Sequence, residues 1–142
     1  MLRVVLDTNQ LVSSLLIAKG LQRRLVDEWR RRSFLLLLGP EQIEEIEEVL
    51  ARRKIARKYR ISAADRSGLI DLLRAEAVLL PSGEAPGVCR DPDDDRLLGS
   101  AVAGGADCLV TGDKDLLSLG EFRGVEIHDA RSFLAILASA TP

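Results

Sequence analysis

Residues 3–18, RVVLDTNQLVSSLLIA, join a short apolar run to four polar residues and a second, mostly apolar stretch. The run Arg3–Leu6 predicts a buried strand, which Asp7, Thr8 and Asn9 bring to an end. Since Asp, Thr and Asn are favoured at the N-caps of helices, the stretch 11–18 is expected to belong to a helix. A strand that passes directly into a helix is the first unit of an alternating α/β chain.

The same alternation continues to the end of the chain. Strands separated by helices pair in parallel, and the helices cover both faces of the sheet. The sequence therefore predicts an α/β fold with three layers, α/β/α, around a central, mainly parallel sheet. Further strands are expected at residues 34–38, 77–80, 108–111 and 125–128, and helices at 21–32, 41–53, 62–76, 93–103 and 130–138.

The composition fits one domain over residues 1–142. Hydrophobic residues make up 46% of the chain, enough for a single core, and the loop 81–92 is too short to separate two domains. No apolar run approaches the roughly 20 residues of a membrane span, and the run 4–6 is too short for a signal-peptide core. Cys89 and Cys108 lie in different expected elements. We therefore expect a cytoplasmic protein in a reducing compartment, with no membrane association.

Charge is distributed unevenly along the chain. Residues 1–60 carry 13 Lys and Arg against 8 Asp and Glu, and residues 61–142 carry 7 against 14, so the two parts stand at +5 and −7. The basic side chains gather in the segment 51–60, where their density is enough to attract the phosphates of a nucleic acid. A solvated helix end explains the same segment without any ligand.

Two acidic residues follow expected strands. Asp7 comes after the first strand, and Asp113 comes after the strand at 108–111. Ligands of open parallel sheets bind beyond the carboxyl ends of the strands, where the strand order reverses, so this placement predicts a site. The structural alternative is that Asp7, Asp113 and Asp115 each cap the helix that follows.

Further acids lie on two expected helices. In the helix at 41–53, Glu45 and Glu47 lie on the two borders of the apolar stripe, and spacing leaves them equally eligible for a site. The acidic run 91–95 opens another helix, where the macrodipole favours negative charge without any function. A calcium loop is excluded there, because Arg96 stands where a Gly is needed and Val102 where a bidentate Glu is needed.

These acids indicate a metal site more strongly if they lie close together in the folded chain. Two carboxylates roughly 6 Å apart repel each other by about 3 kcal/mol at an effective dielectric of about 20. Several such pairs approach the ~5–15 kcal/mol that holds a domain folded, so protonation or a cation has to relieve them. An all-oxygen set selects hard ions such as Mg²⁺ or Mn²⁺, which promote phosphodiester hydrolysis. The sequence offers few other catalysts, since His128 is its single His and it has no P-loop.

Four stretches of the chain, taken together, resemble one known family. In their order and spacing they are similar to the PIN-domain family, most closely to its VapC-like ribonucleases, the toxin components of toxin–antitoxin systems. The resemblance runs from about Leu2 to Leu137 and implies a single PIN-like nuclease domain with an α/β/α fold and with Mg²⁺ or Mn²⁺ as cofactor. The stretches are VVLDTNQLVSSLL at 4–16, GPEQIEEIEEVL at 39–50, CRDPDDDRLLGSAVA at 89–103 and ADCLVTGDKDLL at 106–117.

The resemblance also selects among the acids. It implies Glu45 and not Glu47, because the family places its Glu directly before an apolar residue, here Ile46. In the acidic run it implies Asp95, the last member, with Asp93 or Asp94 as substitutes if the helix begins at a different residue. The implied catalytic and metal-binding set is Asp7, Glu45, Asp95 and Asp113, with Asp115 as an accessory ligand.

The implied activity is that of a metal-dependent endoribonuclease that hydrolyses RNA phosphodiester bonds. Glu45 would bind the metal or position the attacking water, and the other three acids would bind the metal directly. The implied partners are RNA, a small antitoxin protein and a second copy of the chain in a homodimer. Substrate-binding residues are expected to be Thr8, Asn9 and Thr111, together with Arg52, Arg53 and Lys54 of the basic segment.

Two other functions fit parts of the sequence. The first is a non-catalytic PIN-like module that binds RNA or a protein partner, which would not bind divalent ions. The second is an aspartate-dependent phosphatase with Asp7 as nucleophile. Such phosphatases need a second Asp two positions later, where this sequence has Asn9, so the sequence disfavours that function.

Overall fold

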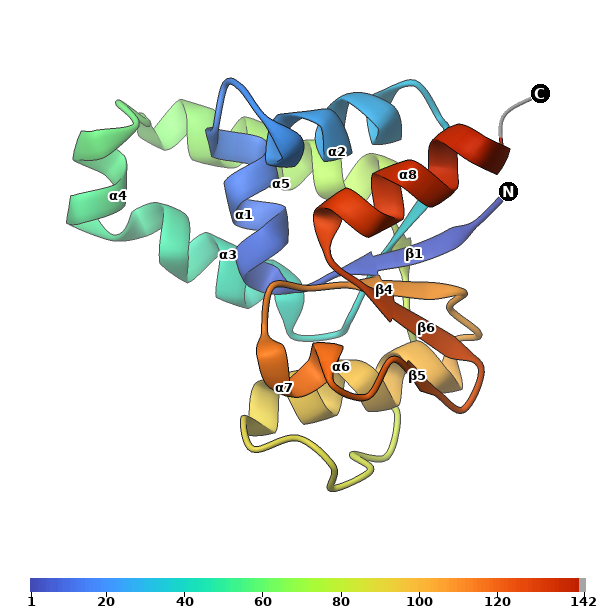
Figure 1. Ribbon diagram of the computed structural model, residues 1–142. Helices are drawn as coiled ribbons and strands as arrows, with labels where there is room; N and C mark the ends of the chain where they lie inside the picture. Colours follow the sequence, from blue (N-terminus) through green and yellow to red (C-terminus); the bar gives the residue numbers. More distant parts are fainter. Residues whose placement is uncertain (141–142) are drawn as a thin grey trace.

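The computed structural model describes residues 1–140, in which strands and helices alternate as expected (Figure 1). The last two residues of the expected domain, 141 and 142, lie outside the described part of the chain. The strands are β1 (Arg3–Leu6), β2 (Leu35–Leu38), β3 (Val78–Leu79), β4 (Cys108–Val110), β5 (Glu121–Phe122) and β6 (Val125–His128). The helices are α1 (Thr8–Leu16), α2 (Leu21–Arg30), α3 (Gln42–Ala51), α4 (Arg53–Lys58), α5 (Ala63–Glu76), α6 (Pro92–Ala103), α7 (Lys114–Leu117) and α8 (Ala130–Ala140).

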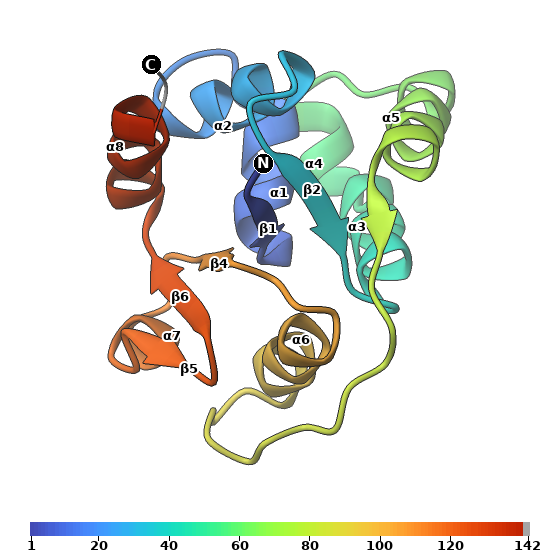
Figure 2. The same ribbon diagram turned by 90° about the vertical axis from the view of Figure 1, so that its right-hand side faces the viewer.

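The strands form one sheet in the order β3-β2-β1-β4-β6-β5. All neighbouring pairs are parallel except β5 and β6. Helices α1, α2 and α8 lie on one side of the sheet and α6 and α7 on the other (Figure 1), while α3 and α5 flank the β2–β3 end (Figure 2). The prediction of a three-layer α/β fold with a mainly parallel sheet is thus confirmed.

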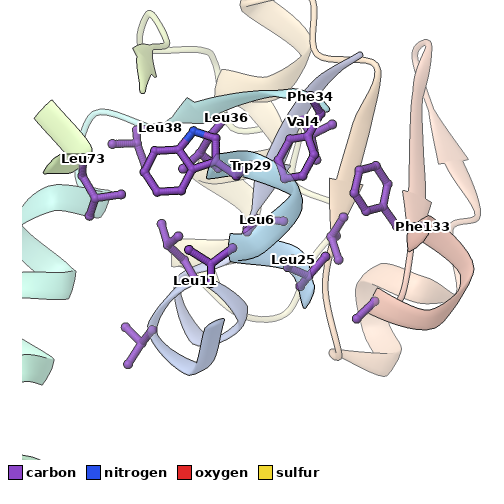
Figure 3. Packing of buried hydrophobic residues seen from close by; sticks show 14 of the residues in the cluster. Val4, Leu6, Leu11, Leu25, Trp29, Phe34, Leu36, Leu38, Leu73 and Phe133 are labelled. Carbon is purple, nitrogen blue, oxygen red and sulfur yellow. The ribbon is translucent and has the colours of Figure 1, made fainter. Parts of the chain in front are cut away.

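The pleat of the strands divides the core into two parts. Val4 and Leu6 point into a large cluster with α1, α2, α3, α5 and α8, and Val5 points into a smaller cluster with α6 and α7. In the large cluster the rings of Phe34 and Phe133 meet edge to face with centroids 5.3 Å apart (Figure 3). Both faces of the central strands are therefore buried, which explains their continuous apolar runs.

The functional edge of the sheet is set by its topology. The chain leaves β1 toward β2 and later returns to pair β4 with the other side of β1, so the strand order reverses between these two strands. Leu6 pairs with Val110, and the N–H of Asp7 donates to the Val110 carbonyl over 3.0 Å. The residues that follow β1 and β4 are consequently neighbours at the carboxyl edge.

The structure differs from the sequence prediction in local details. The helix expected at 41–53 ends at Ala51, because Arg52 is extended (φ −61°, ψ 129°), and the basic residues beyond it form the separate helix α4. Strand β5 was not predicted. It pairs with β6 through a turn in which Arg123 and Gly124 both have positive φ, the geometry of a type I′ hairpin.

Two glycines bring the segment between β3 and α6 against the helix. A Cβ on Gly83 would lie 2.0 Å from the carbonyl oxygen of Gly99, and a Cβ on Gly99 would lie 2.4 Å from the carbonyl oxygen of Glu84. Only residues without a side chain permit this approach of two backbones. The contact packs residues 83–85 against the second half of α6. Within residues 1–140, no helix combines the length and the apolar character needed to cross a bilayer.

Candidate active site

Asp7 lies at the reversal of strand order and is only 6% exposed. It caps α1, since its Oδ1 accepts the Gln10 N–H over 2.8 Å, and its Oδ2 accepts the hydroxyl of Thr111. Burial raises the pKa of Asp7 and the charge of Asp113 raises it further, while the hydrogen bonds from Thr111 and Gln10 oppose these effects. The capping role and a role in a site are compatible, because each carboxylate oxygen accepts one of these hydrogen bonds and keeps a second lone pair.

Thr111 connects the two acids that follow the central strands. Its side chain is fully buried, donates to Asp7, and accepts the N–H of Asp113 at Oγ1 over 3.0 Å. Asp113 in turn caps α7, where its Oδ2 accepts the Leu116 N–H over 3.2 Å. Thr111 thus holds both carboxylate-bearing turns in one arrangement.

Glu45 approaches Asp7 from α3 by way of the residue next to Asp7. The hydroxyl of Thr8 donates to Glu45 Oε2 over 2.6 Å. Burial raises the pKa of Glu45, and this hydrogen bond partly opposes the effect. Glu47, the other border residue of the helix, is instead exposed and paired with Arg74 at 3.4 Å.

Gln42 fixes α3 in this position. It is not among the site residues predicted from the sequence. It is 2% exposed, its Nε2 donates to the Leu6 carbonyl over 2.8 Å, and its Oε1 accepts the Gly39 N–H over 2.9 Å. These contacts fasten the start of α3 to the end of β1. The available signal was a polar residue one helical turn before Ile46, on the buried face of the helix.

In the acidic run, Asp94 lies beside the other acids. Burial raises the pKa of Asp94 to about 7, and the charges of Asp91, Asp7, Asp113 and Asp93 contribute. The carboxylate of Asp94 therefore interacts electrostatically with those of both Asp7 and Asp113.

Asp95, the acid preferred from the resemblance, lies in a different environment. Its carboxylate is 6% exposed and accepts the backbone N–H groups of Gly87, Val88 and Cys89 over 2.8, 2.9 and 3.0 Å. Burial by itself would raise the pKa of Asp95, but the three donors outweigh it and hold the pKa below its usual value. The carboxylate fastens the loop to α6, and it is not in the lining of the acidic pocket that the described residues form.

Asp7, Glu45 and Asp94 line one pocket of about 230 Å³. Asp113 is not in the lining, although its charge acts on both aspartates. Asp115 instead accepts the Arg90 N–H over 2.9 Å. The other lining residues are Thr8, Asn9, Glu41, Gln42, Glu48, Val49, Arg52, Asp91, Asp93 and Leu97.

Some of the expected substrate-binding residues also line the pocket, and others do not. Thr8, Asn9 and Arg52 line the pocket, and Thr111 lies buried behind Asp7. Arg53 and Lys54 are exposed on α4, outside the pocket lining of the described chain. They extend from its rim, since Arg52 directly precedes α4.

The chemistry of the pocket fits a hard divalent ion. Its ligands would be carboxylate oxygens. Burial and then the charges of neighbouring acids raise the pKa of Asp94, and a cation would compensate these charges. Within residues 1–140, no three of these acids bring one oxygen each within 4.8 Å of one another. A bound cation would offset the repulsion between these carboxylates and allow them to come closer together.

Comparison with known proteins agrees with the fold. The sequence profile described as "PIN domain" matches residues 3–115. The chain belongs to the PIN-domain family. PIN domains are typically nucleases that bind divalent metal ions, and the matched span of this PIN domain includes β1 to β4 with Asp7, Glu45, Asp94 and Asp113.

Two further similarities support the assignment. A protein of Methanocaldococcus jannaschii, named "uncharacterized protein MJ1680", is 28% identical over 118 residues, which cover 83% of this chain and 75% of that protein. The crystal structure of PAE2754 from Pyrobaculum aerophilum superposes with a TM-score of 0.65 at 21% identity, covering 97% of this chain and 90% of that one. The second similarity concerns the fold alone.

Proposed function

We propose that this PIN domain is a metal-dependent endoribonuclease that hydrolyses RNA phosphodiester bonds. The observation that carries the proposal is the pocket at the reversal of strand order, where Asp7, Glu45 and Asp94 come together from three elements. Maintaining such a set of buried and half-buried carboxylates costs folding free energy, so a structural role alone is a poor explanation.

The proposed metal ligands are Asp7, Glu45, Asp94 and Asp113. Asp94 takes the place of Asp95, whose oxygens already accept three backbone N–H groups. Mg²⁺ or Mn²⁺ held here supplies Lewis-acid activation of water and neutralises charge on the phosphodiester.

The neighbouring residues orient these acids. Thr111 aligns Asp7 through a hydrogen bond to Oδ2, and Thr8 aligns Glu45 through a hydrogen bond to Oε2. Glu45 lines the pocket from α3 and its pKa is also raised, so it is suited to hold a water or accept its proton. Asn9 is exposed at the pocket and offers an amide to the substrate.

The basic helix α4 is proposed as the path of the RNA backbone. Arg52 lines the acidic pocket and pairs with Glu48 over 3.0 Å, and Arg53, Lys54, Arg57 and Lys58 continue outward on α4, all exposed. Exposed cations adjoining an anionic metal site bind phosphates flanking the one that is cleaved.

A cleavage assay tests this function. Single-stranded RNA and DNA of the same sequence are incubated with the chain in Mg²⁺, Mn²⁺ or EDTA. We expect endonucleolytic cleavage of RNA that requires the metal and is lost in Asp7→Asn. Cleavage that persists in EDTA, or in purified Asp7→Asn, would refute a metal mechanism at this pocket, and cleavage of DNA alone would refute the substrate.

We also propose a toxin role, with an antitoxin protein as partner and a second copy of the chain as a homodimer partner. Its support is the likeness of the four sequence stretches to the toxin branch of the family. Expression of the chain should arrest growth, and expression of Asp7→Asn should not. Co-expression of the adjacent gene should restore growth. Normal growth at an expression level that gives detectable RNA cleavage would contradict the toxin role while leaving the nuclease proposal intact.

A further inference from the structure

A second group of potential metal ligands lies on β4 and β6, which are neighbours in the sheet (Figure 1). Cys108 of β4 is paired with Glu126 of β6, and Val110 is paired with His128. Glu126 and His128 are two residues apart on one strand, so they project from the same face of the sheet. One ligand atom from each of Cys108, Glu126 and His128 lies within 4.8 Å of the other two.

The imidazole of this group lacks a partner for one nitrogen. Nε2 of His128 is buried and has no hydrogen bond within the described part of the chain. Glu126 Oε1 lies 3.5 Å from it, beyond the range of a good N–H···O contact. Buried polar atoms are normally satisfied, so a buried imidazole nitrogen without a hydrogen bond is available to bind an ion or a water.

A structural explanation covers only one member of the group. Cys108 is 1% exposed, and burial raises the pKa of its thiol to about 11, which suits a neutral side chain in the core. That explanation does not extend to His128, because the contact with Glu126 at 3.5 Å leaves Nε2 of His128 without a hydrogen bond in the described residues.

We propose that Cys108, Glu126 and His128 form a second metal site, which takes a borderline-soft divalent ion of the zinc type. Thiolate, imidazole and carboxylate are the ligands of zinc, and three of them leave one position for water. The set shares no residue with the acidic pocket, whose all-oxygen ligands select harder ions. A bound ion would join β4 to β6 on the face covered by α8.

The binding step balances in charge and protons. The S–H bond of Cys108 breaks, a sulfur–metal bond forms, and the proton passes to the solvent. The thiolate and the Glu126 carboxylate then carry two negative charges that offset the two positive charges of the ion. The imidazole binds as a neutral ligand through the lone pair of one ring nitrogen.

Cobalt substitution tests the site directly. The metal-free full-length chain is titrated with Co²⁺, and absorption from thiolate-to-cobalt charge transfer is recorded. The acidic pocket has no thiolate and cannot produce this signal, so the outcome does not depend on the nuclease proposal. We expect the absorption to saturate at one equivalent, to vanish in Cys108→Ser, and to persist in the matched control Cys89→Ser.

A second variant keeps the test decisive if Cys108→Ser does not fold. Glu126 is exposed, so Glu126→Gln is expected to fold normally, and it should weaken Co²⁺ and Zn²⁺ binding at least ~10-fold. Zn²⁺ should also raise the melting temperature of the native chain more than that of Glu126→Gln. Absence of the charge-transfer absorption in the native chain, or equal absorption in folded Cys108→Ser, would overturn the proposal, as would unchanged affinity in Glu126→Gln.

Discussion

The carboxylate of Asp94 lies in the acidic pocket, whereas the carboxylate of Asp95, the next residue, accepts three backbone N–H groups from residues 87–89. The two side chains therefore have opposite electrostatic environments. Burial and surrounding acids raise the pKa of Asp94, and the amide donors hold the pKa of Asp95 below its usual value. One residue belongs to the candidate metal site, and the other fastens the loop that borders it.

Substitution of these neighbours should separate activity from stability. Asp94→Asn should abolish metal-dependent RNA cleavage and leave the free energy of unfolding equal or higher, since it removes a repelled charge. Asp95→Asn should lower that free energy by about 1–3 kcal/mol, because an amide replaces a charged acceptor. Urea denaturation and the cleavage assay measure the two effects. If Asp95→Asn is instead stable and inactive, Asp95 and not Asp94 is the metal ligand.

The raised pKa of Asp94 makes the metal-free protein sensitive to pH. The folded carboxyl titrates at about 7 and the unfolded one near 3.8, so between these values the folded chain holds a proton that the unfolded chain has lost. The free energy of unfolding should therefore fall as the pH rises through this window and level off above it. Denaturation curves in EDTA at a series of pH values test this, with Asp94→Asn as the control. A slope of equal size in the variant would assign the titration to another group.

Thr111 should matter through its hydroxyl and not through its volume. Thr111→Val keeps the shape but removes the donor to Asp7 and the acceptor for the Asp113 N–H. We expect a roughly 10–100-fold loss of metal affinity or activity and a stability cost of about 1–3 kcal/mol. Thr111→Ser, which keeps the hydroxyl, should retain most of both. If valine and serine behave alike, Thr111 does not position the acids.

Two helical glycines provide a matched pair for the packing of the loop on α6. Gly99→Ala should strongly destabilise the chain, because its Cβ would lie 2.4 Å from the Glu84 carbonyl oxygen. Gly68→Ala in α5, where a Cβ meets nothing within 4 Å, should stabilise it by up to about 1 kcal/mol. Thermal melts of both variants suffice. A tolerated Gly99→Ala would mean that the loop is not held against the helix.

Much of the fold follows from local patterns in the sequence. The bounds of β1 and β6 agree with the prediction, because β1 is a short apolar run ended by a polar residue and β6 alternates apolar and polar residues. The helix expected at 62–76 is α5, and its start is marked by Ser62 and Asp65, which form both hydrogen bonds of a capping box. Strand β5 was not predicted, because two residues are too few to show a periodic pattern and the turn after them has Arg123 at positive φ.

Site residues on helices were harder to predict, because the rotational position of a residue on its helix decides where its side chain points. Asp7 and Asp113 follow strands, so topology alone brings them to one edge. Asp94 and Asp95 differ by a single position at the start of α6, and the choice between them depends on the loop at 87–89, which supplies the three N–H donors. That loop is placed by a long-range contact between Gly83 and Gly99, which no local pattern reveals.

The central claim is that the acids of this pocket bind a hard divalent ion. Calorimetric titration of the metal-free chain with Mn²⁺ tests it most directly, using Asp94→Asn, Asp95→Asn and the native chain side by side. We predict binding to the native chain and to folded Asp95→Asn, and affinity at least ~10-fold weaker for Asp94→Asn. No heat of binding in the native chain, or equal affinity in Asp94→Asn, would contradict the account.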